Sequence, residues 1–171
     1  MANRDCPHGF TARFHMTGGE IRTVKVKLCA ANAEIFPGDV LEQEDTGAYD
    51  IAEAADVIGA VSASYAKASD GGYIQVYMDP DIAFSAQTDD GTGTGTAQTC
   101  VGLNVDFVAT AGSGGHSNME IDETSVLSTA TLPWKIIGLY EKIGNAFGEF
   151  NELLVVPNNH KMKGGTGTVG V

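Results

Sequence analysis

Short runs in which apolar and polar residues alternate constrain the fold of this chain more than any other feature of its sequence. Residues 23–28 read TVKVKL, and residues 101–107 read VGLNVDF. A period of two places successive side chains on opposite faces of an extended strand, one face on a core and the other in water. The same alternation returns in residues 73–78, YIQVYM. These runs predict β-strands.

Turn residues separate the apolar runs. Pro37–Gly38 and Asp70–Gly72 are turn signals, and Pro80 interrupts a strand ladder. Gly59 lies inside an apolar run, which indicates a bulge or a close approach of the backbone to a neighbour. Residues 120–130 give no clear secondary-structure prediction. Strands are expected at residues 22–28, 40–41, 57–64, 73–78, 82–87, 99–108, 134–142 and 152–157.

This pattern predicts an all-β fold, a small barrel or sandwich of about seven to eight short strands. We expect a single β domain over residues 21–157. Residues 1–20 contain scattered glycines and no sustained period, so they predict an extended N-terminal arm. Residues 158–171 carry too little apolar surface to fold alone and are expected to form a C-terminal tail.

The chain is strongly acidic, with 10 Lys+Arg against 22 Asp+Glu and a formal net charge of −12. Such a body repels polyanions, so no nucleic-acid partner is expected. The cations gather towards the two ends of the chain. This distribution predicts either an arm that docks on an acidic partner or a strand with a solvated polar face. The clustered cations are Arg4, Arg13, Arg22, Lys25, Lys27, Lys161 and Lys163.

No apolar run approaches the ~20 residues that cross a bilayer, so no membrane partner is expected. The three cysteines, Cys6, Cys29 and Cys100, are widely spaced. The N-terminus also lacks the apolar core of a signal peptide. Together these features predict reduced thiols and assembly in a cytoplasm.

Residues 78–94, MDPDIAFSAQTDDGTGT, are the strongest candidate for chemistry. Asp79 and Asp81 are two residues apart, so on a strand their carboxylates would share a face and could chelate a hard cation. The competing interpretation is a sheet corner at Pro80 and a tight turn at residues 89–91. A phosphate-binding loop is excluded, because the Gly-Thr repeat has neither the lysine nor the following helix that it needs.

The remaining reactive side chains form no pattern typical of catalysis. Cys6, His8, His15 and Cys29 lack the spacing of a structural zinc site. No Gly-x-Ser-x-Gly elbow is present, and His116 in its glycine-rich loop is expected to be solvated. We therefore expect no enzyme activity, no catalytic residue, no bound metal and no cofactor.

The resemblance to a known family rests on several stretches of the sequence. They are ANRDCPHGFTARFHMTGGEIRT at residues 2–23, FPGDVLE at 36–42, IAEAADVIGAVSASY at 51–65, YIQVYMDPDIAFSAQ at 73–87, CVGLNVDF at 100–107 and WKIIGLYEKIGNAFGEFNELLVVPNNH at 134–160. In these stretches the chain resembles the small capsid decoration, or cement, proteins of tailed bacteriophages.

The resemblance implies a non-enzymatic virion structural protein on the outer capsid surface, assembled in the host cytoplasm. It would bind the major capsid protein and stabilise contacts between capsid subunits. It would also bind itself, as a homotrimer or else a dimer. From the residues, we expect weak contacts from both ends of the chain to sum by multivalency. The predicted contact residues are Arg4, Phe10, Arg13 and Phe14 in the arm, and His160, Lys161 and Lys163 in the tail.

Two other functions remain open. One is a carbohydrate- or receptor-binding virion module, which would sit on a tail or fibre. The other is a trimeric β-barrel nucleotide hydrolase that uses Asp79, Asp81 and a metal ion.

Overall fold

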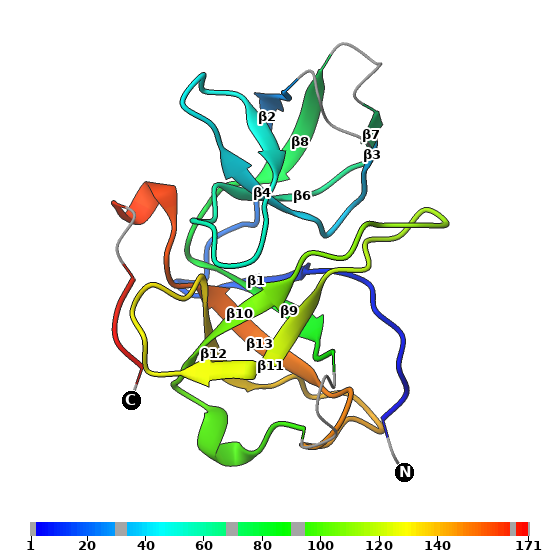
Figure 1. The fold of residues 1–171 in the computed structure, drawn as a ribbon, viewed down its shortest axis with the longest axis vertical. Helices are drawn as coiled ribbons and strands as arrows, with labels where there is room; N and C mark the ends of the chain where they lie inside the picture. The colour runs from blue at the N-terminus through cyan, green and yellow to red at the C-terminus, as the bar shows by residue number, and fades with distance from the viewer. Residues whose placement is uncertain (1–2, 30–33, 68–71, 90–94, 165–166, 171) are drawn as a thin grey trace.

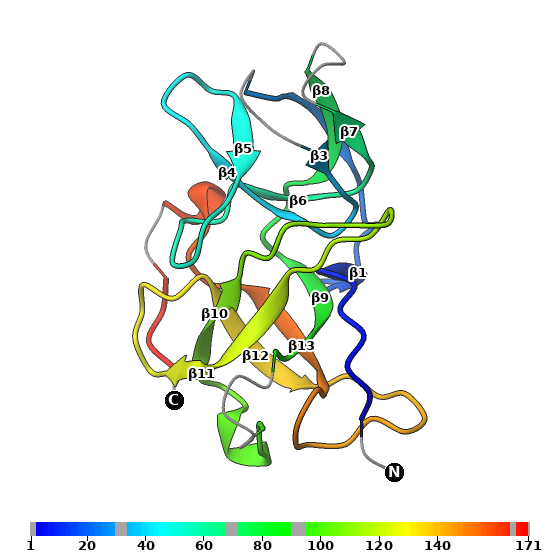
Figure 2. The same cartoon turned by 45° about the vertical axis from the view of Figure 1, so that its right-hand side comes forward.

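A computed structural model describes residues 3–29, 34–67, 72–89, 95–164 and 167–170 of the chain. Over these residues the fold is all-β, with two main sheets arranged along the long axis of the molecule (Figures 1 and 2). The described residues include no helix that is long and apolar enough to span a bilayer.

The larger sheet is antiparallel and has six strands. In spatial order these are β1 (Thr11–His15), β9 (Ile82–Gln87), β13 (Glu152–Pro157), β12 (Trp134–Leu139), β10 (Asn104–Val108) and β11 (Glu120–Leu127). This sheet occupies the lower part of the molecule in Figure 1.

The second sheet is also antiparallel and has five strands. Their spatial order is β2 (Val24–Lys27), β8 (Tyr73–Tyr77), β6 (Ala60–Ser62), β4 (Val40–Gln43) and β5 (Tyr49–Ile51). A short pair, β3 (Glu34–Ile35) with β7 (Ala66–Lys67), forms a third sheet. Two short 3₁₀ helices complete the described elements, η2 (Gln98–Cys100) and η3 (Lys161–Lys163).

None of these sheets closes into a barrel, although both main sheets curl. A single bridge joins Leu28, after β2, to Tyr49 at the opposite end of the five-stranded sheet. Another bridge joins Thr88, after β9, to Ile121 in the edge strand β11. Each main sheet thus curves around apolar side chains, but its edges are joined by single bridges and not by a continuous ladder of hydrogen bonds.

The alternating sequence runs form strands as predicted. In β8, Ile74 and Val76 are buried while Tyr73 and Gln75 are exposed. Thirteen strands lie within the described residues, more than the seven or eight that were expected. The additional ones include pieces of two or three residues such as β3, β5 and β7, which are too short to show a period. The predicted turns at residues 70–72 and 89–91 fall largely outside the described residues.

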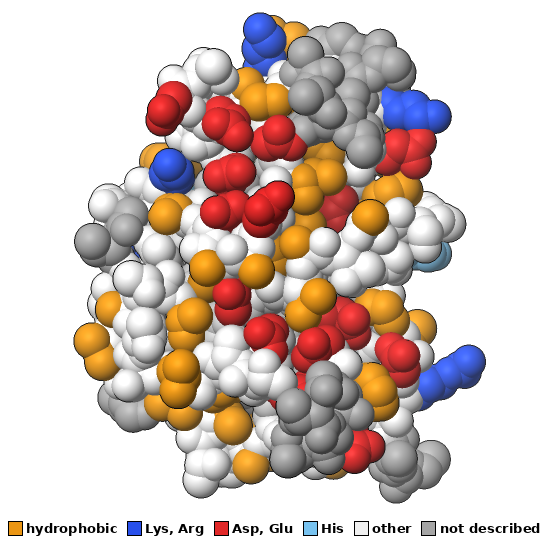
Figure 3. Space-filling view, in the orientation of Figure 1, with side chains coloured by type: hydrophobic (Ala, Val, Ile, Leu, Met, Phe, Trp, Pro, Cys, Tyr) orange, Lys and Arg blue, Asp and Glu red, His pale blue; other side chains and the backbone are white. Residues whose placement is uncertain are grey.

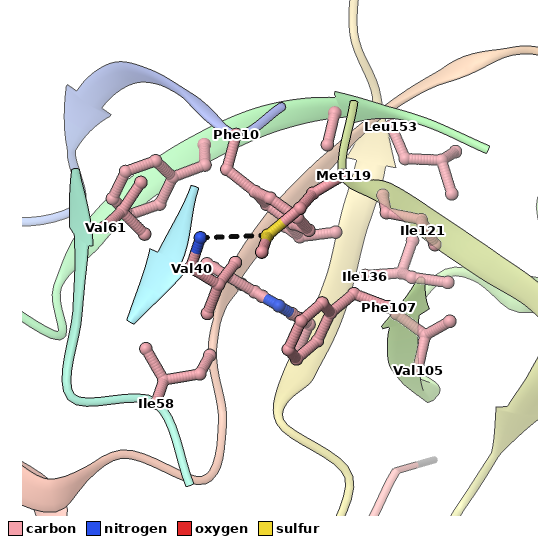
Figure 4. Packing of buried hydrophobic residues seen from close by; sticks show 14 of the residues in the cluster. Phe10, Val40, Ile58, Val61, Val105, Phe107, Met119, Ile121, Ile136 and Leu153 are labelled. Atoms are coloured by element: carbon pink, nitrogen blue, oxygen red, sulfur yellow. Dashed lines mark hydrogen bonds between the residues drawn. The ribbon is translucent and has the colours of Figure 1, made fainter. Parts of the chain in front are cut away.

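The main hydrophobic core lies between the two main sheets. The first two residues of β4 and all three of β6 are buried. Alternate residues of these strands point to opposite sides and pack in two different hydrophobic cores. Val40 and Val61 pack in the main core with side chains of the six-stranded sheet, while Leu41 and Ala60 pack in a smaller second core. Figure 4 shows the main core, where the backbone N–H of Val40 donates to the sulfur of Met119 at 3.1 Å.

Gly59 stands just before β6 because a side chain would not fit there. A Cβ at this position would lie 2.8 Å from the backbone nitrogen of Gln43 in β4. The close backbone approach predicted from the sequence is therefore confirmed.

The N-terminal segment differs from a free arm. Residues 11–15 form β1, which pairs with β9, and Phe10 is only 1% exposed. Gly9 permits this entry with a φ of +70°, since a Cβ there would lie 2.5 Å from the Ser117 side chain. Phe10 in this segment is a core residue. The sequence did not predict this, because the segment has no hydrophobic period.

The described part of the C-terminal tail also lies on the chain's own body. The backbone N–H of Thr168 donates to Asn158 Oδ1 at 2.9 Å, and Asn104 Nδ2 donates to the Thr168 carbonyl at 2.6 Å. Buried asparagine amides thus hold residues 167–170 against β10, in place of apolar packing.

Candidate interaction surface

The corner between β8 and β9 is built by Asp79, Pro80 and Asp81. The Asp81 backbone N–H donates to Asp79 Oδ1 at 2.9 Å, and His15 Nε2 lies 3.0 Å from Asp79 Oδ2. The hydrogen bond from Asp81 lowers the pKa of Asp79 against the effect of its burial, and His15 lowers it further. Both carboxylate oxygens of Asp79 are engaged within the chain, as expected for a sheet corner.

A metal site at this corner finds no support in the geometry. Among the described residues there is no group of three or more His, Cys, Asp or Glu side chains placed to hold an ion. The zinc candidates are also separated, since His15 binds Asp79 while Cys29 follows β2 in the other main sheet. The three cysteines are free thiols.

Asp81 is where the two ends of the chain meet. The backbone N–H of Met16, just after β1, donates to the Asp81 carbonyl at 2.8 Å. From the C-terminal side, Lys163 Nζ in η3 lies 4.0 Å from Asp81 Oδ1. Segments almost 150 positions apart in sequence therefore border one surface.

This surface exposes large apolar side chains. Phe14 is 43% exposed, Met16 is 51% exposed and Met162 is 65% exposed. A shallow hollow of about 440 Å³ is lined by Met78, Asp79, Pro80, Asp81 and Met162. We call Phe14, Met16, Met78 and Met162, with the exposed Lys161 and Lys163, the methionine surface.

Exposed large apolar side chains around a hollow, with charged residues beside them, are typical of a protein interaction site. Methionine suits such a site because its unbranched side chain adapts to irregular partners. The sequence indicated Phe14, Lys161 and Lys163 as contact residues but not Met16 or Met162. Met16 precedes Thr17 and two glycines, and Met162 lies between two lysines. Neither methionine belongs to a hydrophobic period that would have indicated a surface role.

His160 differs from the exposed contact residue that was expected. It is 1% exposed, and its Nδ1 accepts a hydrogen bond from the backbone N–H of Met162 at 3.0 Å. Burial lowers the pKa of His160 to about 4, helped by Lys163 and opposed by Asp79. A neutral imidazole therefore caps η3 and holds Met162 at the surface.

The predicted contact residues of the N-terminal segment are divided between several environments. Phe10 is in the core, so it cannot touch a partner in this fold. Arg13 donates to Glu152 Oε1 at 3.1 Å and lies over the ring of Tyr140 at 4.3 Å. Arg4 is exposed near the chain start, away from the methionine surface.

Sequence reasoning missed Glu152, a 2%-exposed carboxylate at the start of β13. Burial opposes its ionisation, but hydrogen bonds from His8, Lys142 and Ser85 hold its pKa well below the usual range. An acid that opens an apolar run, ELLVVP, gave no sign that it would be buried.

Sequence reasoning also missed Glu120 at the start of β11, because residues 120–130 gave no clear prediction. Burial, together with the nearby charges of Asp5, Asp89 and Glu123, raises its pKa to about 7. Within the described chain its Oε1 is buried without a hydrogen-bond partner.

Acidic side chains gather in groups on the face shown in Figure 3, and few basic side chains lie there. Over the β4–β5 hairpin, burial raises the pKa of Glu42, and the charges of Asp56, Glu44 and Asp50 raise it further. This repulsion between like charges disfavours contact with another acidic surface.

Comparisons with known proteins leave the family open. No protein-family model, no curated protein and no solved structure matches this chain.

Proposed function

We propose that this chain is a structural protein of a tailed-bacteriophage virion. It binds the outer surface of the head and stabilises contacts between major capsid subunits. The observation that carries the proposal is the methionine surface, where Phe14, Met16 and Met162 expose apolar area beside two lysines. Large apolar patches that stay exposed on a protein surface mark sites where a partner binds.

The placement of this surface suits a docking role. It is bordered by both ends of the chain, and Asp81 and His160 fix the segments that carry it. Segments whose backbone is already fixed lose little backbone conformational entropy on binding, which raises the affinity available from a small contact area. Lys161 and Lys163 would pair with carboxylates at the rim of the capsid contact.

The rest of the body fits a position outside the DNA compartment. A net charge of −12 opposes binding to packaged nucleic acid and leaves capsid protein as the partner. We regard the two main sheets with their shared core as a sandwich-like body. In a homotrimer, or a dimer, several weak contacts would act together on the lattice.

The experiment uses phage heads from which the protein has been removed, and measures how much purified full-length chain rebinds. The double variant Met16→Asp and Met162→Asp should bind about tenfold more weakly or worse, since it places charge in the apolar contact. A matched control, Val24→Asp with Leu127→Asp, charges two exposed apolar positions elsewhere and should bind normally. Equal binding by both double variants would contradict the proposed contact.

A further inference from the structure

A second hollow lies at the chain's N-terminal end, between residues 3–8 and the loop of residues 142–150. Its volume is about 340 Å³, and it is lined by the cations Arg4 and Lys142 and by the imidazole of His8. No Asp or Glu is among the described residues that line it. In a chain of net charge −12, a pocket lined by cations concentrates positive potential locally.

Hydrogen bonds fix the walls of this pocket. Asn3 Nδ2 donates to the carbonyls of Ala146 and Glu149, both at 2.8 Å. Gln87 Nε2 donates to the carbonyls of Arg4 at 2.7 Å and Phe150 at 2.9 Å. The pocket therefore exists before any ligand arrives.

Glu152, which does not line the pocket, contacts two of the side chains that do. The side chain of Lys142 donates to Glu152 Oε2, and His8 Nε2 lies 3.5 Å from Oε1. Ser85 Oγ donates to Oε1 at 2.5 Å, and Arg13 donates to the same oxygen. The Glu152 carboxylate is thus occupied within the protein and does not cancel the charge of Arg4.

Arg4 is the cation of this pocket that is available to bind a ligand. It is exposed, it lines the pocket, and it makes no ion pair with any described residue. A guanidinium presents planar paired N–H donors that match the two oxygens of a carboxylate or phosphate.

We propose that this pocket binds an oxyanion, a carboxylate or phosphate group, with Arg4 as the paired donor and Lys142 as the second cation. Its volume exceeds that of the anionic group alone and lies in the range of small-molecule sites. Ile143 and Phe150 line the remaining space, so the rest of the ligand meets apolar surface. This site is independent of the capsid contact, because it shares no residue with the methionine surface.

Isothermal titration calorimetry of the full-length protein tests this site. Sodium phosphate and sodium succinate are titrated separately at constant ionic strength. At least one should bind saturably, and Arg4→Gln should weaken that binding by about 10- to 100-fold, the loss expected for charge-assisted hydrogen bonds. Arg22→Gln is the control, since Arg22 pairs with Glu20 and both are 81% exposed.

Binding of phosphate alone, succinate alone or both would support the site and identify the anion that it accepts. Thermal unfolding of Arg4→Gln should match the parent protein, because the guanidinium has no described bond to lose. Absence of saturable binding by both anions, or binding that Arg4→Gln leaves unchanged, would overturn the proposal.

Discussion

The rings of Phe10 and Trp134 stack with their centroids 4.3 Å apart and their planes 9° from parallel. Trp134 is fully buried, and Phe10 is 1% exposed. A segment without sequence periodicity therefore supplies a central ring of the main core. Its anchoring positions β1, and with it the N-terminal side of the methionine surface.

The two phenylalanines of this segment should behave differently. We expect Phe10→Ala to lower the free energy of unfolding by about 3–5 kcal/mol, since it leaves a cavity against Trp134. Phe14→Ala, at a 43%-exposed position, should change it by about 0.5 kcal/mol or less. Urea denaturation followed by tryptophan fluorescence measures both. Equal losses would mean that Phe10 is not a core residue.

His160 should make stability depend on pH in the mildly acidic range. Its pKa is about 4 in the folded chain, below the ordinary value of 6.5. Between these two pH values the unfolded chain binds a proton that the folded chain does not, so stability falls as the pH is lowered. The loss should reach roughly 2–3 kcal/mol near pH 4.

The variant His160→Asn keeps an acceptor for the Met162 N–H but does not titrate. Its unfolding free energy should fall less than that of the parent between pH 6.5 and pH 4. His116→Asn, at an exposed position, serves as the control and should follow the parent curve. If His160→Asn also follows it, His160 is not the group responsible.

Glu120 should act in the opposite direction. Its folded-state pKa of about 7 exceeds the ordinary 4.5, so it favours the folded chain at low pH and this contribution is lost as the pH rises to 7. Glu120→Gln should therefore gain stability relative to the parent between pH 4.5 and 7, by an amount on the order of 1 kcal/mol after allowance for solvent screening. Glu141→Gln, at an exposed site, should show no such trend. A difference that stays constant with pH would contradict this role.

The Glu152 network should contribute far more to stability than an exposed ion pair. Glu152→Gln leaves Arg13, Lys142 and His8 without their shared acid. Because these partners are partly exposed, the variant should cost about 1.5–3 kcal/mol at neutral pH, the range for hydrogen bonds to a charged group. Arg22→Gln removes an exposed pair with Glu20 and should cost less than about 1 kcal/mol. Chemical denaturation of the two variants under the same conditions compares them. Similar small losses would show that the buried network is not stabilising.

The sequence predicted strands correctly where one face of the strand is exposed to solvent. In β8 the exposed Tyr73 and Gln75 alternate with the buried Ile74 and Val76, and the prediction is confirmed. In β2 the buried Val26 lies between two exposed lysines, although Val24 at the strand's start is exposed. Strand β11 was ambiguous because polar residues occupy inward positions as well as outward ones, and Glu123 is buried. Strand β1 was missed because it is an edge strand with intermediate and exposed side chains.

The candidate surface was less predictable than the strands. Phe14, Lys161 and Lys163 were indicated by their places near the chain ends, but Met16 and Met162 join them only through the corner at Asp81. His160 could not be recognised as buried, because its cap on η3 depends on tertiary packing. Local sequence does not encode such long-range contacts.

Immunogold electron microscopy tests the proposed function most directly. Antibodies raised against the purified chain are applied to intact particles of the bacteriophage that carries it under the proposed function, and the positions of the gold particles are recorded. A head-binding structural protein predicts gold over the outside of the heads. Gold confined to tails or fibres, or particles without label, would contradict it.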